Sequence, residues 1–303
     1  MSVSPLGWVR MLKQGSIIRW LSNTTLAEVV GESLNRRLPL NYRIMRLVSR
    51  SNHLRNAAIR HHSRATRPAI TTTAETLFGG LDVNETLRSL DEKGFAVGIV
   101  LPPDNVAKIL AFCAEAAFVD DYSKDPLSVD PEDERIPWPG RLTYRCPNPH
   151  KQCEVVDKLT RDPVLVAVAR AYLKTEPLLR SSRIFWSYPD LSQGYNPLYG
   201  FHYDIDDYKF LKQFFYLNDV DLDRGPHVII EGTHKRKNWF EKNHRRLTDE
   251  QAENRYRDRI RVIAGSSGHG FFEDTFCYHK GAKPRKRRLI LEFQYAISSA
   301  AIA

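Results

Sequence analysis

Residues 200–220, with the sequence GFHYDIDDYKFLKQFFYLNDV, carry the pattern that decides the fold. The second half of this stretch, KQFFYLNDV (212–220), is dominated by aromatic and other apolar side chains and is typical of a β-strand. Turns rich in glycine and proline separate it from further short runs of the same kind. Many short strands at such spacing predict a β-sandwich or a β-barrel. The other runs lie at 183–188, 227–232, 261–265, 270–275 and 288–295.

Helical patterns precede these strands. Residues 84–118 predict a helix, a short strand and a second helix, with Asn84 as the N-cap of the first helix and Gly94 at its end. A further helix fits residues 162–174, DPVLVAVARAYLK. The polar stretch 235–260 interrupts the strands and is also predicted to be helical. The chain is therefore predicted to be mainly β, of the α+β class.

The formal charge of +9 belongs entirely to the first 80 residues, which hold twelve Lys and Arg residues and three acidic residues. The rest of the chain has as many basic as acidic residues, which argues against a nucleic-acid-binding body, because tracking phosphates requires a net basic face. Residues 64–75 have the Ser, Thr and Pro content of a linker. We therefore predict a basic, partly helical or flexible N-terminal extension over residues 1–75 and one globular domain over 80–303.

The basic extension allows several interpretations. Its apolar residues from Trp8 to Leu21 lie near one helical face, so residues 1–70 could contact an anionic membrane surface or an acidic partner. The segment is also rich in Arg and poor in acids, as an organelle transit peptide would be. A solvated or partner-packed N-terminal helix is the simplest interpretation, because runs of charge are usually solvated faces.

Four cysteines at irregular spacing do not form a disulfide framework, which favours a reducing compartment. No apolar run has the length of a membrane span, and no secretory signal is recognisable. We predict a cytoplasmic protein, or an organelle-targeted one if the organism is eukaryotic.

The candidate chemistry starts at His202 and Asp204. Residues i and i+2 of a strand point to the same side, so this imidazole and this carboxylate can face one point inside a barrel. A third ligand from a distant strand would complete a 2-His-1-carboxylate set, which leaves open positions and suits non-haem iron(II). The candidate for this ligand is His279, at the end of a β-prone run and just before Lys280 and Gly281.

An arginine that follows His279 could bind a dicarboxylate through paired hydrogen bonds. Arg287 shares its strand face with Leu289, Leu291 and Phe293, whereas Arg288 shares its face with Glu292 and Gln294. Because the first face is the more apolar, we expect Arg287 to point inward, with Arg288 as the alternative. Asp206 and Asp207 are weaker ligand candidates than Asp204, and His234 is more typical of a structural turn. No motif in the sequence pairs His227 with another potential metal ligand.

From His202 to Phe293 the chain resembles the phytanoyl-CoA dioxygenase family of iron(II)/2-oxoglutarate oxygenases. The resemblance covers roughly residues 80–296 and rests on an ordered series of motifs rather than on any one of them. These motifs are His202-Tyr203-Asp204, Leu217-Asn218-Asp219-Val220, Gly225-Pro226, Gly232-Thr233-His234-Lys235, Gly270-Phe271-Phe272, His279-Lys280-Gly281 and Arg287-Arg288-Leu289.

The resemblance implies a double-stranded β-helix, that is, a cupin-like jelly roll with flanking helices. It implies that His202, Asp204 and His279 bind Fe(2+), that Arg287 or Arg288 binds the co-substrate 2-oxoglutarate, and that O2 is consumed. Trp186 and Tyr188 are candidates for further contacts with oxoglutarate. The implied reaction hydroxylates a C–H bond of a small-molecule or lipid-like substrate and releases succinate and CO2. The presence of Asp204 disfavours halogenation, because halogenating relatives have a small residue there.

Two other classes of function stay open. One is a non-catalytic or regulatory jelly-roll protein with a vestigial metal site. The other is a cupin-like isomerase or hydrolase that uses a metal without oxoglutarate. An occupied dicarboxylate site would separate the oxygenase from both.

Overall fold

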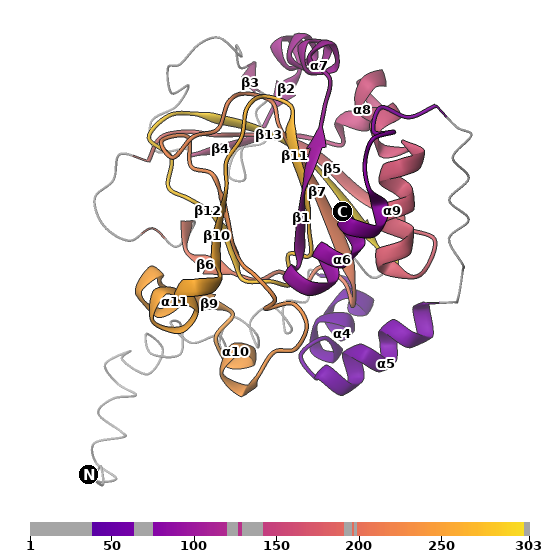
Figure 1. Ribbon diagram of the computed structural model, residues 1–303, viewed down its shortest axis with the longest axis vertical. Coiled ribbons are helices and arrows are strands. Elements are labelled where there is room, and N and C mark those ends of the chain that lie inside the picture. Colours follow the sequence, from indigo (N-terminus) through magenta and orange to yellow (C-terminus); the bar gives the residue numbers. More distant parts are fainter. Residues whose placement is uncertain are drawn as a thin grey trace, which may run out of the picture.

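The computed structural model of the 303-residue chain describes residues 38–63, 75–119, 127–128, 142–190, 196 and 199–299. In these residues two antiparallel sheets face each other, which is the arrangement of the predicted jelly roll (Figure 1). The six-stranded sheet has the order β1 (Phe95–Val100), β11 (His269–Glu273), β7 (Phe210–Tyr216), β13 (Arg288–Ala296), β5 (Leu178–Ser187) and β4 (Thr143–Pro147). The five-stranded sheet has the order β10 (Ile260–Ile263), β8 (His227–Ile230), β12 (His279–Gly281), β6 (Phe201–His202) and β9 (Arg246–Leu247).

Each predicted β-prone run contains a strand, so this part of the prediction is confirmed. β4 and β9 had no sequence prediction. The strands expected at His202 and His279 are short: β6 ends at His202, so Asp204 follows the strand, and β12 begins at His279. A further pair, β2 (Ala117–Phe118) and β3 (Leu127–Ser128), forms a separate small sheet.

Helices cover the outer face of the six-stranded sheet (Figure 1). Leu289, Leu291 and Phe293 of β13 belong to a core cluster with apolar residues of these helices. All nine residues of β13 are buried, because its other face lies between the two sheets. The helices of this cluster are α6 (Val83–Lys93), α7 (Pro103–Glu115), α8 (Glu154–Thr160) and α9 (Pro163–Leu173).

The start of α6 corrects one prediction. The side chain of Asp82, not that of Asn84, caps the helix by accepting a hydrogen bond from the Glu85 N–H. Gly94 does end this helix, with a positive φ of 87° that glycine adopts without strain. The predicted helix at 162–174 is found as α9, and the Asp162 side chain caps its N-terminus.

The insertion between β8 and β10 contains α10 (Trp239–Asn243), β9, α11 (Asp249–Tyr256) and the 3-10 turn η3 (Arg257–Arg259). The four cysteines are free and buried, which agrees with the predicted absence of a disulfide framework. None of the described helices combines the length and the apolar composition that crossing a bilayer requires.

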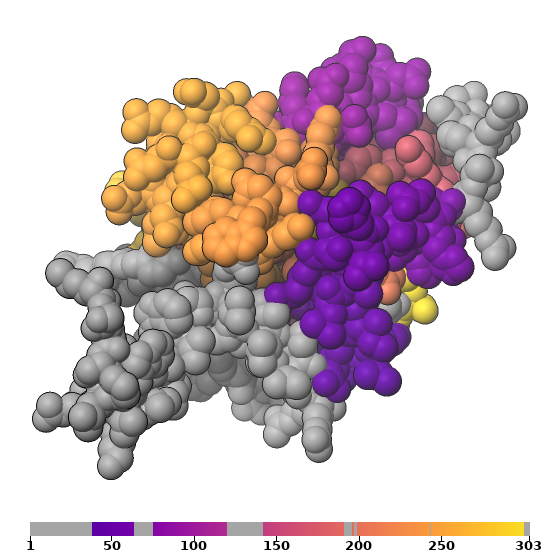
Figure 2. Space-filling view, turned by 90° about the horizontal axis from the view of Figure 1, so that it is seen from below, coloured from indigo at the N-terminus to yellow at the C-terminus, as the bar shows by residue number. Residues whose placement is uncertain are grey.

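Two helices of the predicted N-terminal extension pack on the globular domain. Tyr42 and Met45 of α4 (Leu40–Val48) join a core cluster with Phe201 and Tyr203. Helix α5 (Asn52–His62) follows, and the Arg55 guanidinium donates a hydrogen bond to the Tyr208 carbonyl. Figure 2 shows α4 and α5 (indigo) forming one surface with the chain around residue 240 (orange). The amphipathic stretch from Trp8 to Leu21 and the linker-like residues 64–74 lie outside the described residues.

Replacing Met45 with Ala tests this packing. Met45 is fully buried, so we expect the free energy of unfolding to fall by about 2–5 kcal/mol. Ile44 precedes it on α4 and is 48% exposed, so Ile44→Ala should cost clearly less. Urea unfolding of the full-length protein measures both values. Equal losses for the two variants would mean that α4 does not pack on the barrel through Met45.

Candidate metal centre

Strand pairing brings the three predicted ligands together. In the five-stranded sheet, β6 pairs with β12, and His202 lies directly opposite His279. Asp204 follows two residues after His202. Its Oδ1 lies 3.9 Å from His202 Nε2, and its Oδ2 lies 3.7 Å from His279 Nε2. The three potential ligand atoms lie within 4.8 Å of one another, a spacing that can surround one cation with metal–ligand bonds of about 2 Å.

Backbone carbonyls orient both imidazoles. The Nδ1 atom of His202 is 3.1 Å from the Gly200 carbonyl oxygen, and Nδ1 of His279 is 3.1 Å from the Cys277 carbonyl oxygen. If each Nδ1 carries the hydrogen, each Nε2 presents a lone pair toward Asp204. Burial lowers the pKa of His202 and lowers that of His279 to about 4, so both rings are neutral near pH 7, as metal ligands must be.

Asp204 is held in its ionised form by Lys212 of β7. The Lys212 ammonium lies 2.8 Å from Asp204 Oδ2 and 3.3 Å from Asp206 Oδ2. Burial alone would raise the pKa of Asp204, but the Lys212 charge holds that pKa well below its usual range. Asp204 therefore offers a carboxylate rather than a carboxylic acid.

Further polar side chains lie between the sheets and were not predicted. His227 Nε2 lies 2.6 Å from Glu273 Oε2, and the His227 ring stacks on the His279 ring at a centroid distance of 5.5 Å. Burial raises the pKa of Glu273 to about 8. The sequence signal for such residues is a polar side chain inside an otherwise apolar strand, as with Lys212 and Gln213 in FLKQFFY.

The structure corrects the expected orientation of the two arginines. Arg288, not Arg287, lies on the face of β13 that points between the sheets, and it donates hydrogen bonds to the Gly225 carbonyl and the Ser187 hydroxyl. Its Nε atom is buried without a hydrogen-bond partner, and no described carboxylate forms an ion pair with it. The guanidinium of Arg287 lies 4.8 Å from the Trp186 ring centre. The apolar face of β13 packs against helices rather than against the other sheet. The apolar neighbours of Arg287 therefore did not show which arginine points between the sheets.

Trp186 and Tyr188 also lie away from the site. Both belong to the same core cluster as Ile184 and Leu289, whereas Ser187 points to Arg288 between the sheets. Strand alternation therefore places Trp186 on the helix-facing side of β5, which argues against a contact of these two residues with oxoglutarate. Both side chains are fully buried and contribute to this core cluster.

The weaker ligand candidates have other partners. Asp206 pairs with Lys212, while Asp207 accepts hydrogen bonds from the Ile297 and Ser298 N–H groups and fixes the end of β13. His234 Nε2 lies 3.1 Å from the Asp91 carbonyl oxygen, as a structural turn residue would.

The chain matches no family model and no curated protein sequence. The solved structure of the epimerase SnoN in complex with Fe3+, alpha ketoglutarate and nogalamycin RO is 16% identical, with a TM-score of 0.50 over 70% of this chain and 82% of that chain. HygX from Streptomyces hygroscopicus with nickel, 2-oxoglutarate and hygromycin B bound is 19% identical, with a TM-score of 0.49 over 70% and 86%. EctD from S. alaskensis with bound Fe is 17% identical, with a TM-score of 0.47 over 77% and 85%. The likeness to SnoN confirms the predicted jelly-roll fold.

Replacing Lys212 with Met would leave Asp204 and Asp206 buried without their counter-ion. We expect the metal-free variant at pH 7 to lose about 3–5 kcal/mol of unfolding free energy, measured by urea unfolding. Because folding lowers the pKa of Asp204, its ionised carboxylate stabilises the wild type at pH values above about 4, the pKa of Asp in an unfolded chain. The difference in unfolding free energy between the wild type and Lys212→Met should therefore become smaller as the pH falls below about 4.

The matched control for this experiment is Lys158→Met. It removes a solvent-exposed ion pair with Glu154 and should change stability little at any pH. A Lys212→Met variant as stable as this control would contradict the role of Lys212 as counter-ion.

Proposed function

We propose that the chain is an iron(II)- and 2-oxoglutarate-dependent oxygenase that acts on a small-molecule or lipid-like substrate. The observation that carries this proposal is the pairing of two features between the sheets. One is the group of two neutral imidazoles and one ionised carboxylate around a single point. The other is the buried Arg288, a cation without a carboxylate partner in the described part of the chain.

The donor set fits iron(II). His202, Asp204 and His279 supply two nitrogens and one oxygen, the combination that binds non-haem iron(II) and leaves positions for other ligands. The side chain of His202 is 26% exposed, against 7% for His279, so the open side of the centre lies near His202. We propose that the substrate approaches from this side.

Arg288 fits the far carboxylate of 2-oxoglutarate. Burying an unpaired guanidinium is costly, and a bound carboxylate would supply the missing partner and the acceptor for Nε. The Ser187 hydroxyl, 3.2 Å from Arg288 Nη2, could donate a second hydrogen bond to the same carboxylate. We assign the co-substrate to Arg288 rather than to Arg287.

The protein residues position and protect the reacting groups. Bound iron(II), with 2-oxoglutarate and O2, would supply the oxidation of a substrate C–H bond with release of succinate and CO2. His202 and His279 hold their Nε2 lone pairs in place, and Lys212 keeps Asp204 ionised. Phe214, Ile229, Phe271 and Ile290 form an apolar cluster between the sheets and exclude water.

The complex of SnoN with nogalamycin RO supports a small-molecule substrate for this fold. Hydroxylation is our proposal for the outcome of the reaction, and Asp204 disfavours halogenation because its carboxylate occupies the position that a halide would need.

Anaerobic addition of iron(II) and 2-oxoglutarate tests the metal centre. We expect the weak visible charge-transfer band that such complexes give, and we expect His202→Ala and His279→Ala to abolish it. His244→Ala is a control, since the Nδ1 atom of His244 contacts the Phe240 carbonyl outside the site. Metal binding without the band on adding oxoglutarate would favour the isomerase or hydrolase class. The absence of metal binding would favour a vestigial site.

Replacing Arg288 tests the co-substrate site. A buried charge pair that loses one partner costs about 2–5 kcal/mol, so Arg288→Gln should weaken 2-oxoglutarate binding to the iron(II)-loaded protein by roughly 30-fold or more. Arg288→Lys should restore part of the affinity. Titration of the visible band measures the dissociation constant, and melting temperatures report folding. If only Arg287→Gln weakened binding, the assignment to Arg288 would be wrong.

A further inference from the structure

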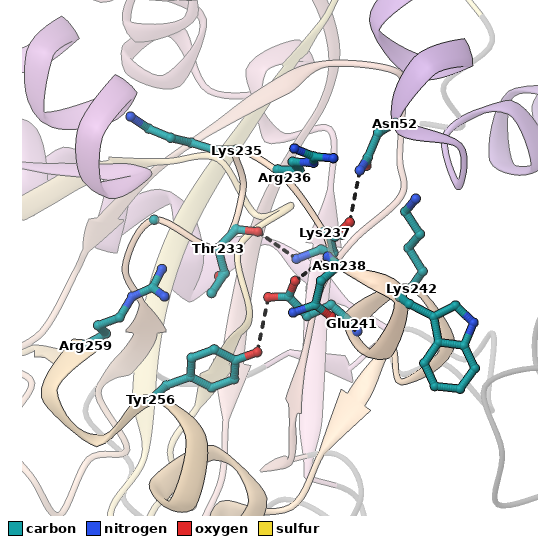
Figure 3. A pocket seen from close by; sticks show the side chains of 12 residues that line it. Asn52, Thr233, Lys235, Arg236, Lys237, Asn238, Glu241, Lys242, Tyr256 and Arg259 are labelled. Atoms are coloured by element: carbon teal, nitrogen blue, oxygen red, sulfur yellow. Dashed lines mark hydrogen bonds between the residues drawn. The ribbon is translucent and has the colours of Figure 1, made fainter.

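A pocket lies outside the barrel, and none of the candidate metal ligands lines it. It has a volume of about 620 Å³ and lies between the turn that follows β8, helix α10, the end of α11 and helix α5 (Figure 3). Asn52 of α5 closes one side by donating a hydrogen bond of 3.0 Å to the Lys237 carbonyl. The pocket therefore joins the N-terminal helices to the insertion between β8 and β10.

The side chains that line this pocket are strongly basic. Its single carboxylate is that of Glu241, and both oxygens of this group are already in use. Oε2 accepts a hydrogen bond from the Asn238 N–H at 2.6 Å, and Oε1 accepts one from the Tyr256 hydroxyl at 3.1 Å. Glu241 thus belongs to the capping box of α10 rather than to a counter-ion cluster. The five cations of the lining are Lys235, Arg236, Lys237, Lys242 and Arg259.

Three of these cations have partners within the protein. Lys237 is buried, donates a hydrogen bond to the Thr233 carbonyl and lies 4.2 Å from the Tyr203 ring centre. Arg259 donates to the Glu231 carbonyl, and Lys235 lies 3.7 Å from the Asp91 carboxylate. These contacts hold the three side chains in place along the pocket wall.

The other two, Arg236 and Lys242, form no ion pair with a carboxylate in the described residues. In Figure 3 their charged ends lie on the same side of the pocket as the Asn52 amide, whereas Lys235 extends away. Arg236 is exposed and Lys242 is half-buried, so water and salt screen part of their repulsion. The positive potential that they still create at one pocket wall favours a bound anion.

We propose that this pocket binds a phosphate group. A phosphate monoester carries a charge of about −1.5 to −2 at pH 7, which matches the two unpaired cations. The planar Arg236 guanidinium can donate two parallel hydrogen bonds to phosphate oxygens, and Lys242 adds a point charge. Trp239 at the rim is 77% exposed and offers an apolar surface to the rest of the ligand. The phosphate could belong to a soluble phosphorylated compound or to a phospholipid headgroup.

The proposed site is independent of the metal centre. Lys237 contacts the rings of Tyr203 and Tyr278, which alternate along the chain with His202, Asp204 and His279. Successive side chains of an extended segment point to opposite sides, so the pocket and the candidate ligands lie on opposite sides of the two segments that contain β6 and β12. Failure of either proposal leaves the other untouched, because iron(II) and phosphate binding are measured separately.

The test compares two phosphate sources on the full-length protein. Calorimetry with pyrophosphate probes a soluble ligand, and co-sedimentation with phosphatidylcholine vesicles, with or without phosphatidic acid, probes a headgroup. We expect the wild type to bind at least one source and R236E/K242E to bind it at least tenfold more weakly. K108E/K151E changes the net charge equally at exposed positions on α7 and before α8 and should bind like the wild type.

If the wild type binds pyrophosphate and R236E/K242E does not, the ligand is a soluble phosphate compound. If the wild type binds only vesicles that contain phosphatidic acid, and R236E/K242E does not, the ligand is a phospholipid headgroup. No binding to either source, or an equal loss in the two double variants, would overturn the proposal. Should R236E/K242E fail to fold by circular dichroism, R236Q/K242Q takes its place, with the same expectation against K108Q/K151Q.

Discussion

The ion pair between Lys212 and Asp204 is the interaction on which the interior of the barrel depends. Two aspartates lie between the sheets, where unpaired charge would cost several kcal/mol, and a single ammonium at 2.8 and 3.3 Å serves both. The same ion pair keeps Asp204 ionised and ready for a metal. Glu292 with Arg183 repeats the arrangement nearby. Glu273 and His227 lie in contact but form no ion pair near pH 7, because burial raises the pKa of Glu273 to about 8 and lowers that of His227 to about 3. The interior between the sheets thus combines ion pairs with an uncharged polar pair and an apolar cluster.

Much of the fold was predictable because its long strands have a clear local pattern. The major strands and the helix at 163–173 follow from apolar runs, caps and turn residues that lie next to each other in the sequence. His202 and Asp204 were predictable for the same reason, since two residues of spacing suffice. His279 required the order of motifs in the family, because no local rule links it to a residue 75 positions away.

The errors in the site have one physical cause. A half-buried strand has one apolar and one polar face, and its apolar face points to the core. β13 is buried on both faces, so its apolar face meets helices and its polar face meets the site. The rule therefore chose Arg287. Trp186, a candidate taken from the family resemblance, lies on the same helix-facing side as Leu289. A polar residue inside an apolar strand, such as Lys212, is visible in the sequence. Its pairing with Asp204, and the pairing of His227 with Glu273, could not be predicted because the partners come from distant segments.

The docking of α4 and α5 shows that charge composition alone does not define a domain boundary. Met45 is buried in the barrel cluster, and Arg55 and Asn52 bind carbonyls of Tyr208 and Lys237. Side-chain contacts, as well as the covalent connection to α6, thus hold α4 and α5 on the barrel. A chain severed between α5 and α6 would remain a two-piece assembly, and a peptide of the helices could in principle be added back to a barrel made without them.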